Sequence, residues 1–141
     1  MGKSGWEYVT PYDEDLAVVL GRLRQEVFER GRYHWPAGLD RPADLDQLDD
    51  EWPAAEGTHS VLDVDYVIDA ADEDSGGALR PLGDAGLERF FGTVRPSVAD
   101  FERTTDSRFK GGLPAVWCGY AATLFDGGRP SAVGIWGFSG D

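Results

Sequence analysis

The sequence predicts an α+β fold, a single domain over residues 1–141 in which helices pack on a mainly antiparallel sheet that ends in a C-terminal β-hairpin. Three observations support this prediction. A clear amphipathic helix lies near the start of the chain, a glycine-centred pair of β-prone segments lies at its end, and the elements between them lack regular βαβ alternation. The length fits one domain, and no Pro- or Ser-rich linker divides it.

The first predicted element is a short, aromatic, β-prone strand at residues 6–9. We expect a helix to follow, with Thr10 as its cap, Pro11 at its first position and Gly31 at its end. Its apolar residues recur at helical spacing and form one stripe: Leu16, Val19, Leu20, Leu23, Val27 and Phe28.

The middle of the chain is less regular. Residues 44–52 predict a short acidic helix that ends at Pro53, because proline cannot continue a helix. Residues 60–68 are rich in β-branched and apolar side chains and predict a strand. Residues 72–77 predict a turn or loop, which leads to a second short strand or an extended link at residues 79–82.

Two helices and a hairpin complete the prediction. One helix runs from its cap at Asp84 to residue 91, and the other opens at residue 96 or 97 and runs through 104. Residues 115–125 and 131–139 flank a turn that contains two glycines, which permit the positive φ angles of a hairpin turn.

The negative charge of the chain is concentrated in one segment. The formal net charge is −13, and residues 40–74 carry thirteen acidic side chains against one base, Arg41. The remainder of the chain is nearly neutral. We therefore expect an acidic central segment within a domain whose remaining charges nearly cancel. The net charge then belongs to one surface rather than to the whole chain.

Composition also argues against several classes of protein. A strongly acidic chain is not expected to bind nucleic acid or an anionic membrane directly, since both need a positive face. We find no apolar run of about 20 residues and no signal-peptide pattern, and expect a cytoplasmic protein without a membrane segment. No phosphate-binding glycine loop or zinc spacing occurs, so we expect no cofactor.

Aromatic and acidic side chains meet at the start of the acidic segment, where we predict a partner-binding surface. Trp and Tyr beside charge are common at protein interfaces, because they bury area and keep a polar tip. Packing in the core is the competing interpretation of these aromatic residues. The candidate partner-binding residues are Tyr33, Trp35, Asp46, Asp49, Asp50, Glu51 and Trp52.

A metal site is the alternative interpretation of the acidic segment. Asp63 and Asp65 would share one face of the expected strand, with His59 just before it, and hard cations prefer clustered carboxylate oxygens. The spacing of the acids does not match an EF-hand loop. Alternating polar residues on a half-exposed strand would look the same.

Cys118 is the one cysteine of the chain, which excludes an internal disulfide. A histidine lying near it in space would make a nucleophile and base pair. We interpret Cys118 instead as a small buried residue, because it lies inside an apolar predicted strand.

Parts of the chain resemble a recurring group of small bacterial proteins known mainly from actinobacteria and myxobacteria. The resemblance rests on WxYVxPYxxDL at residues 6–16, LRxxxFxxGxYxxP at 23–36, GTHSVLD at 57–63 and GTxRP at 92–96. The group has no established activity, so the resemblance implies no catalytic residue. In size, acidity and aromatic content the chain also resembles small immunity proteins that neutralise toxins.

These observations predict a non-enzymatic binding protein that docks a basic protein partner through its acidic, aromatic-flanked surface. Complementary charge speeds encounter and rejects wrong partners. A toxin-neutralising immunity protein is one concrete form of this function. The alternatives are a metal-assisted hydrolase that uses the clustered carboxylates, and a housekeeping domain whose acidity serves solubility.

Overall fold

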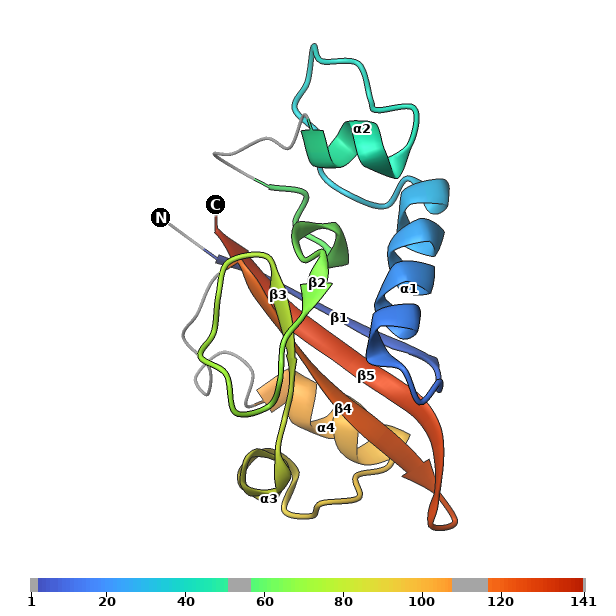
Figure 1. Cartoon of the computed structure of the whole chain (residues 1–141), viewed down its shortest axis with the longest axis vertical. Coiled ribbons are helices and arrows are strands. Elements are labelled where there is room, and N and C mark those ends of the chain that lie inside the picture. The colour runs from blue at the N-terminus through green and yellow to red at the C-terminus, as the bar shows by residue number, and fades with distance from the viewer. Residues whose placement is uncertain (1–2, 51–56, 108–116, 141) are drawn as a thin grey trace.

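A five-stranded sheet organises the chain in a computed structural model that describes residues 3–50, 57–107 and 117–140 (Figure 1). Across the sheet the strands run in the order β1 (Lys3–Pro11), β5 (Arg129–Gly140), β4 (Cys118–Asp126), β3 (Ala78–Pro81) and β2 (Tyr66–Val67). The first and last strands of the chain are therefore neighbours, and the N- and C-terminal ends lie together at one end of the sheet (Figure 1).

The sheet is mixed, so the expectation of a mainly antiparallel sheet is wrong. Strand β5 pairs antiparallel with β1 and β4, whereas β3 pairs parallel with both β4 and β2. The cause lies in the connections, since the chain crosses from β3 to β4 through two helices and re-enters the sheet in the same direction. The C-terminal hairpin is present, and Gly127 and Gly128 form its turn with positive φ angles.

Helix α1 (Leu16–Arg30) begins later than expected. Pro11 is the last residue of β1, where it pairs with Ala132, so neither Thr10 nor Pro11 starts the helix. The cap is Asp15, whose carboxylate accepts a hydrogen bond from the Ala17 N–H at 3.0 Å. Gly31 ends the helix in a left-handed conformation, as predicted, and the apolar stripe faces the sheet.

The acidic segment forms little regular structure. Helix α2 (Leu45–Asp50) confirms the expected acidic helix, and its predicted end at Trp52–Pro53 lies outside the described residues. The strand expected at 60–68 is largely wrong. A single turn of 3₁₀ helix, η1 (Val61–Asp63), stands in its place and is followed by the two residues of β2.

Helices α3 (Asp84–Phe91) and α4 (Val98–Ser107) form the crossover between β3 and β4. Asp84 is the first residue of α3 rather than its cap, which is Gly83. Ahead of α4, Ser97 and Asp100 bond reciprocally: each side chain accepts a hydrogen bond from the backbone N–H of the other at 3.0 Å. This capping box fixes the start of α4 where the sequence predicted it, and the helix continues past Thr104.

Apolar side chains pack on both faces of the sheet, which gives the molecule three layers. Helix α1 and η1 cover one face over Val133 and Ile135 of β5, while α3 and α4 cover the other over Trp136 (Figure 1). Alternate residues of β5 thus serve opposite layers. Among the described residues, no helix is long and apolar enough to cross a membrane.

Candidate functional site

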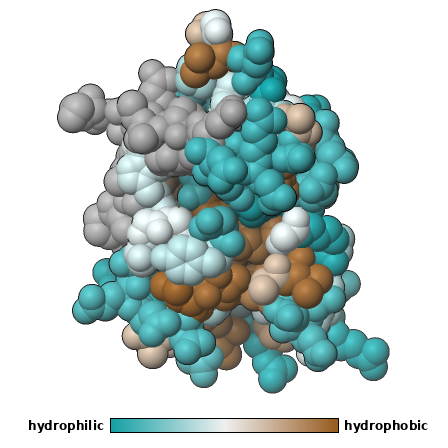
Figure 2. Space-filling model, turned by 45° about the horizontal axis from the view of Figure 1, so that its top comes forward, coloured by the Kyte–Doolittle hydropathy of each residue, from teal (hydrophilic) through white to brown (hydrophobic). Residues whose placement is uncertain are grey.

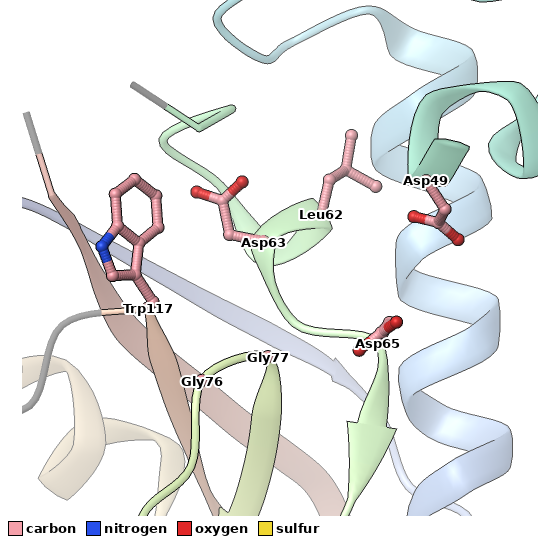
Figure 3. A pocket seen from close by; sticks show the side chains of 7 residues that line it. All are labelled: Asp49, Leu62, Asp63, Asp65, Gly76, Gly77 and Trp117. Carbon is pink, nitrogen blue, oxygen red and sulfur yellow. The ribbon is translucent and has the colours of Figure 1, made fainter. Parts of the chain in front are cut away.

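A pocket of about 550 Å³ opens between η1, the end of α2 and the strand edge at β2 and β3. Figure 3 shows the side chains of Asp49 and Asp65 on one side of it and the Trp117 indole on the other, with Asp63 and Leu62 between them. Gly76 and Gly77, just before β3, complete the lining. Three of the seven lining residues are carboxylates, and all three belong to the acidic segment.

Asp63 is the structural centre of this site. Its side chain is buried, and one carboxylate oxygen accepts hydrogen bonds from the Thr58 N–H at 2.7 Å and the Thr58 hydroxyl at 2.8 Å. The other oxygen accepts from the His59 N–H at 3.1 Å and from the hydroxyl of Ser139 in β5. A buried carboxylate needs such donors, since an unsatisfied buried charge is costly. Asp63 therefore holds the pocket wall in place.

The backbone beside Asp63 adopts conformations that L-residues rarely take. His59 has φ of 53° and Trp117 has φ of 66°, both in the left-handed region. Gly57 is also left-handed, and a Cβ placed there would lie 2.2 Å from the Trp117 ring. The indole is thus packed directly against the Gly57 backbone, which only a glycine permits.

Asp49 and Asp65 differ in how their charges are balanced. The Asp49 carboxylate lies 2.7 Å from the guanidinium of Arg24, whose side chain is 9% exposed. Asp65 is exposed, and among the described residues no side chain or backbone group donates a hydrogen bond to its carboxylate. The pocket therefore presents negative charge that is most available at Asp65.

Tyr33 and Trp35 lie in the core beside α1 rather than on an exposed aromatic surface. Each is 9% exposed, and the Tyr33 ring stacks on Phe28 with ring centres 6.1 Å apart. The Trp35 indole donates a hydrogen bond to the Asp40 carbonyl at 3.0 Å, and the Arg41 guanidinium lies 4.6 Å from the centre of the Tyr33 ring. Both aromatics therefore fasten the loop after α1, and the competing core interpretation describes them better.

The acidic candidates on α2 divide into two groups. Asp46, Asp49 and Asp50 are all exposed, and of the three Asp49 lines the pocket and pairs with Arg24. Glu51 and Trp52 lie outside the described residues. Of the sequence-derived candidates, the structure thus brings Asp49, Asp63 and Asp65 to one pocket.

The geometry gives less support to the hypothesis of a metal site at Asp63, Asp65 and His59. Both Asp63 oxygens already accept two hydrogen bonds each, which occupies the lone pairs that a cation would need. His59 instead stacks on His34, with ring centres 4.8 Å apart. Within residues 3–50, 57–107 and 117–140, no three His, Cys, Asp or Glu side chains gather in a way that would hold a metal ion.

Cys118 is buried at the start of β4, and its thiol donates a hydrogen bond to the Ser75 carbonyl at 3.2 Å. Desolvation by burial, together with the nearby Asp74 carboxylate, raises the pKa of this thiol. The same two causes raise the pKa of Tyr120, whose hydroxyl donates to Asp74 at 2.7 Å. A raised pKa lowers the thiolate fraction, so this environment does not activate a nucleophile.

Sequence reasoning missed the contribution of Trp117 and of the glycines before β3. Trp117 falls within a segment predicted as strand, and its left-handed backbone carries no sequence signal, since such conformations favour glycine or asparagine. Gly77 lies in the predicted turn, and a Cβ there would lie 3.1 Å from the Asp65 carboxylate. Both residues bring a wall of the pocket close to the acidic side chains.

Comparisons with protein-family models, with curated proteins and with solved structures found no match to this chain. The site must therefore be interpreted from its own geometry and chemistry.

Proposed function

We propose that this protein is a non-enzymatic binding protein that docks a basic protein partner, and that the acidic pocket receives a Lys or Arg side chain of that partner. The observation that carries the proposal is the convergence of Asp49, Asp63 and Asp65 with the Trp117 indole on one pocket of about 550 Å³. A carboxylate and an aromatic ring together suit a cation, through charge and through the electron-rich ring face.

The electrostatics of the pocket favour an incoming base. Arg24 is not one of the lining residues, and its guanidinium is bonded to Asp49 and to the Leu62 carbonyl. Asp65 is left as an exposed negative charge, across the pocket from the Trp117 indole. An arriving guanidinium would pair with Asp65 and lie near the indole without displacing an internal contact.

The wider charge pattern supports the same class of partner. Asp46 and Asp50 are exposed on α2 beside the pocket, so the surface around it is also negative. Such a surface steers a basic partner toward the site over several ångströms, and the steering weakens as salt screens it. A toxin-neutralising immunity protein, directed at a basic nuclease, is one concrete form of this proposal.

The pocket is tested with acetyl-arginine amide as the probe, followed through the backbone amides of Asp65 and Trp117 in two-dimensional NMR spectra. We expect saturable shifts at both amides. They should be absent with acetyl-citrulline amide, which has the same shape and no charge. The Asp65→Asn variant should bind at least fivefold more weakly, whereas Glu88→Gln, an equal charge change on exposed α3, should bind as the wild type does.

Equal binding of the citrulline probe, or an unchanged affinity in Asp65→Asn, overturns the proposed pocket. For a protein partner, association should slow markedly between about 50 mM and about 300 mM salt. An association rate that does not change with salt concentration would contradict docking that is steered by charge.

A further inference from the structure

A second hollow, of about 470 Å³, lies at the carboxyl ends of β2 and β3, on the far side of β2 from the acidic pocket. Its walls come from the loop before α1, the ends of the two strands, the start of α3 and the edge of β4. Its floor is largely apolar and includes Val67, Leu82, Leu87, Val94, Ala121 and Phe125. Figure 2 shows hydrophobic residues gathered near the middle of the molecular face, with hydrophilic residues around them.

This groove exists because β3 is shorter than β4. Strand β3 pairs with β4 only as far as Pro81 and Ala121, while β4 continues to Asp126. The Leu82 N–H donates to the Ala121 carbonyl, and the Phe125 N–H donates to the Pro96 carbonyl. The edge of β4 is thus occupied at residues 121 and 125, with a gap between them.

Thr123 lies in that gap. Alternate residues of a strand turn their N–H and C=O groups to the same edge, so Thr123 faces the same side as residues 121 and 125. Within the described parts of the chain, no residue bonds to the Thr123 backbone from this side. One amide and one carbonyl are therefore presented to the groove, and these are the two groups that one residue of an added partner strand would bond.

The rim of the groove is acidic. Asp13, Glu14, Asp69 and Asp84 line it, and among its described lining residues none is Lys or Arg. Arg95 lies nearby, with its guanidinium 5.6 Å from the centre of the Phe125 ring, but it is not one of the residues that line the groove. An occupant should therefore carry positive charge outside and apolar side chains toward the floor.

We propose that this groove docks a short extended segment of a partner protein, in which apolar residues alternate with Lys or Arg and whose backbone bonds to Thr123. The alternation follows from strand geometry, because successive side chains point to opposite sides. Apolar residues would enter the groove while basic residues meet the four rim carboxylates. The inference deepens the proposed function by giving the basic partner a second contact, and it rests on that function for the identity of the partner as a protein.

The test uses a library of capped peptides, about nine residues long, that alternate Lys or Arg with Val, Ile, Leu or Phe. A matched library carries Glu in place of each base. Binding is followed by NMR with wild-type protein, and we expect the basic library to shift the amides of Thr123, Leu87 and Val94. Methylating the backbone nitrogens of the best peptide should weaken its binding about tenfold, because this removes its hydrogen-bond donors without altering the protein.

The charge contribution is tested with the double variant Asp69→Asn, Asp84→Asn against Glu29→Gln, Glu88→Gln, which removes the same charge outside the groove. The first should weaken the basic peptide at least fivefold and the second should not. Equal binding of the acidic library, or no shift at Thr123, overturns the inference. Shifts at Asp65 and Trp117 without a shift at Thr123 would refute the groove and leave the proposed function standing. A shift at Thr123 without shifts at Asp65 and Trp117 would support the groove and refute the proposed acidic pocket.

Discussion

The carboxylate of Asp63 accepts a hydrogen bond from the hydroxyl of Ser139, which lies 76 residues later in the chain. Ser139 in turn accepts a hydrogen bond from the Trp6 indole N–H at 3.1 Å. This relay joins the turn at η1 to the two strands, β1 and β5, that pair at the edge of the sheet. The pocket wall that carries Asp63 is therefore anchored to β5, which pairs with β1 on one side and with β4 on the other.

Replacing Asp63 with asparagine should destabilise the fold by about 2–4 kcal/mol. Asparagine has one acceptor oxygen. Its NH₂ group would face N–H and O–H groups that now donate hydrogen bonds to Asp63, so buried donors would be left without an acceptor. The free energy of unfolding in urea measures this loss. Asp65→Asn is the matched control, since Asp65 is exposed, and it should stay within about 0.5 kcal/mol of the wild type. Equal effects of the two variants would contradict the anchoring role.

Gly57→Ala should cost more stability than Gly38→Ala, although both glycines are left-handed. At Gly38, with φ of 87°, a Cβ would meet nothing within 4 Å, so alanine there carries only the backbone cost of about 1 kcal/mol. At Gly57, with φ of 64°, the Cβ would collide with the Trp117 ring at 2.2 Å and add an overpacking cost of about 1–3 kcal/mol. Thermal unfolding of the two variants measures the difference. Similar losses would mean that the indole moves aside easily.

Local patterns were sufficient to predict much of the fold. The apolar stripe of α1, the Gly31 stop, the start of α4 near Ser97 and the glycine turn of the hairpin depend on residues within a few positions of each other. The prediction of a strand at residues 60–68 failed for a physical reason. Val61 and Val64 are buried as strand residues would be, but the Ser60 side chain caps a 3₁₀ turn. Thr58 and His59 also bond to Asp63.

The site was only partly predictable from the sequence. The spacing of the acidic residues singled out Asp63 and Asp65, and the acidic, aromatic composition around residue 50 singled out Asp49. No local sequence pattern showed that these three side chains meet at one pocket. The burial of Asp63 depends on Ser139, and the aromatic wall depends on the left-handed backbone of Trp117. The parallel arrangement of β2 and β3 is also non-local, since it follows from crossovers rather than from any strand's own residues.

The Cys118 thiol should react slowly with Ellman's reagent in the folded protein. Burial and the Asp74 carboxylate raise its pKa, so little thiolate forms near pH 8, and the thiol is also shielded from the reagent. The same protein in urea should react at the rate of an ordinary cysteine. Fast reaction of the folded chain would instead support an activated thiol at this position.

Alkaline pH should destabilise the fold, in part through Tyr120. Its pKa is raised by desolvation and by Asp74, so the folded state keeps the proton that the unfolded state releases above about pH 10. The contribution to stability is therefore complete below that pH and is lost as pH rises through the folded pKa. The Tyr120→Phe variant should be less stable at neutral pH, because it lacks the bond to Asp74, and should lose less stability between about pH 9 and pH 11. Urea unfolding across this range gives both slopes, and equal slopes would exclude Tyr120 as the source.

Acid pH should weaken the start of α4 through Asp100. The backbone N–H of Ser97 is the largest cause that lowers the pKa of this carboxyl, and the Ser97 hydroxyl and Arg103 act in the same direction. A depressed pKa means that the folded state favours the charged form, so the contribution to stability is present above the unfolded pKa of about 3.9. It is lost as pH falls through the lower folded value.

Asp100→Ala removes this titration, so the variant should be less stable at pH 7 and should lose less of its remaining stability on going to about pH 2.5. Ser97→Ala is the informative partner, because it removes the hydroxyl bonded by the Asp100 N–H but keeps the backbone donor to the carboxylate. It should cost about 1 kcal/mol at pH 7 and retain most of the acid dependence. Urea unfolding of the three proteins at both pH values separates the two halves of the capping box. If Asp100→Ala showed the same acid dependence as the wild type, the carboxylate at the start of α4 would not be its source.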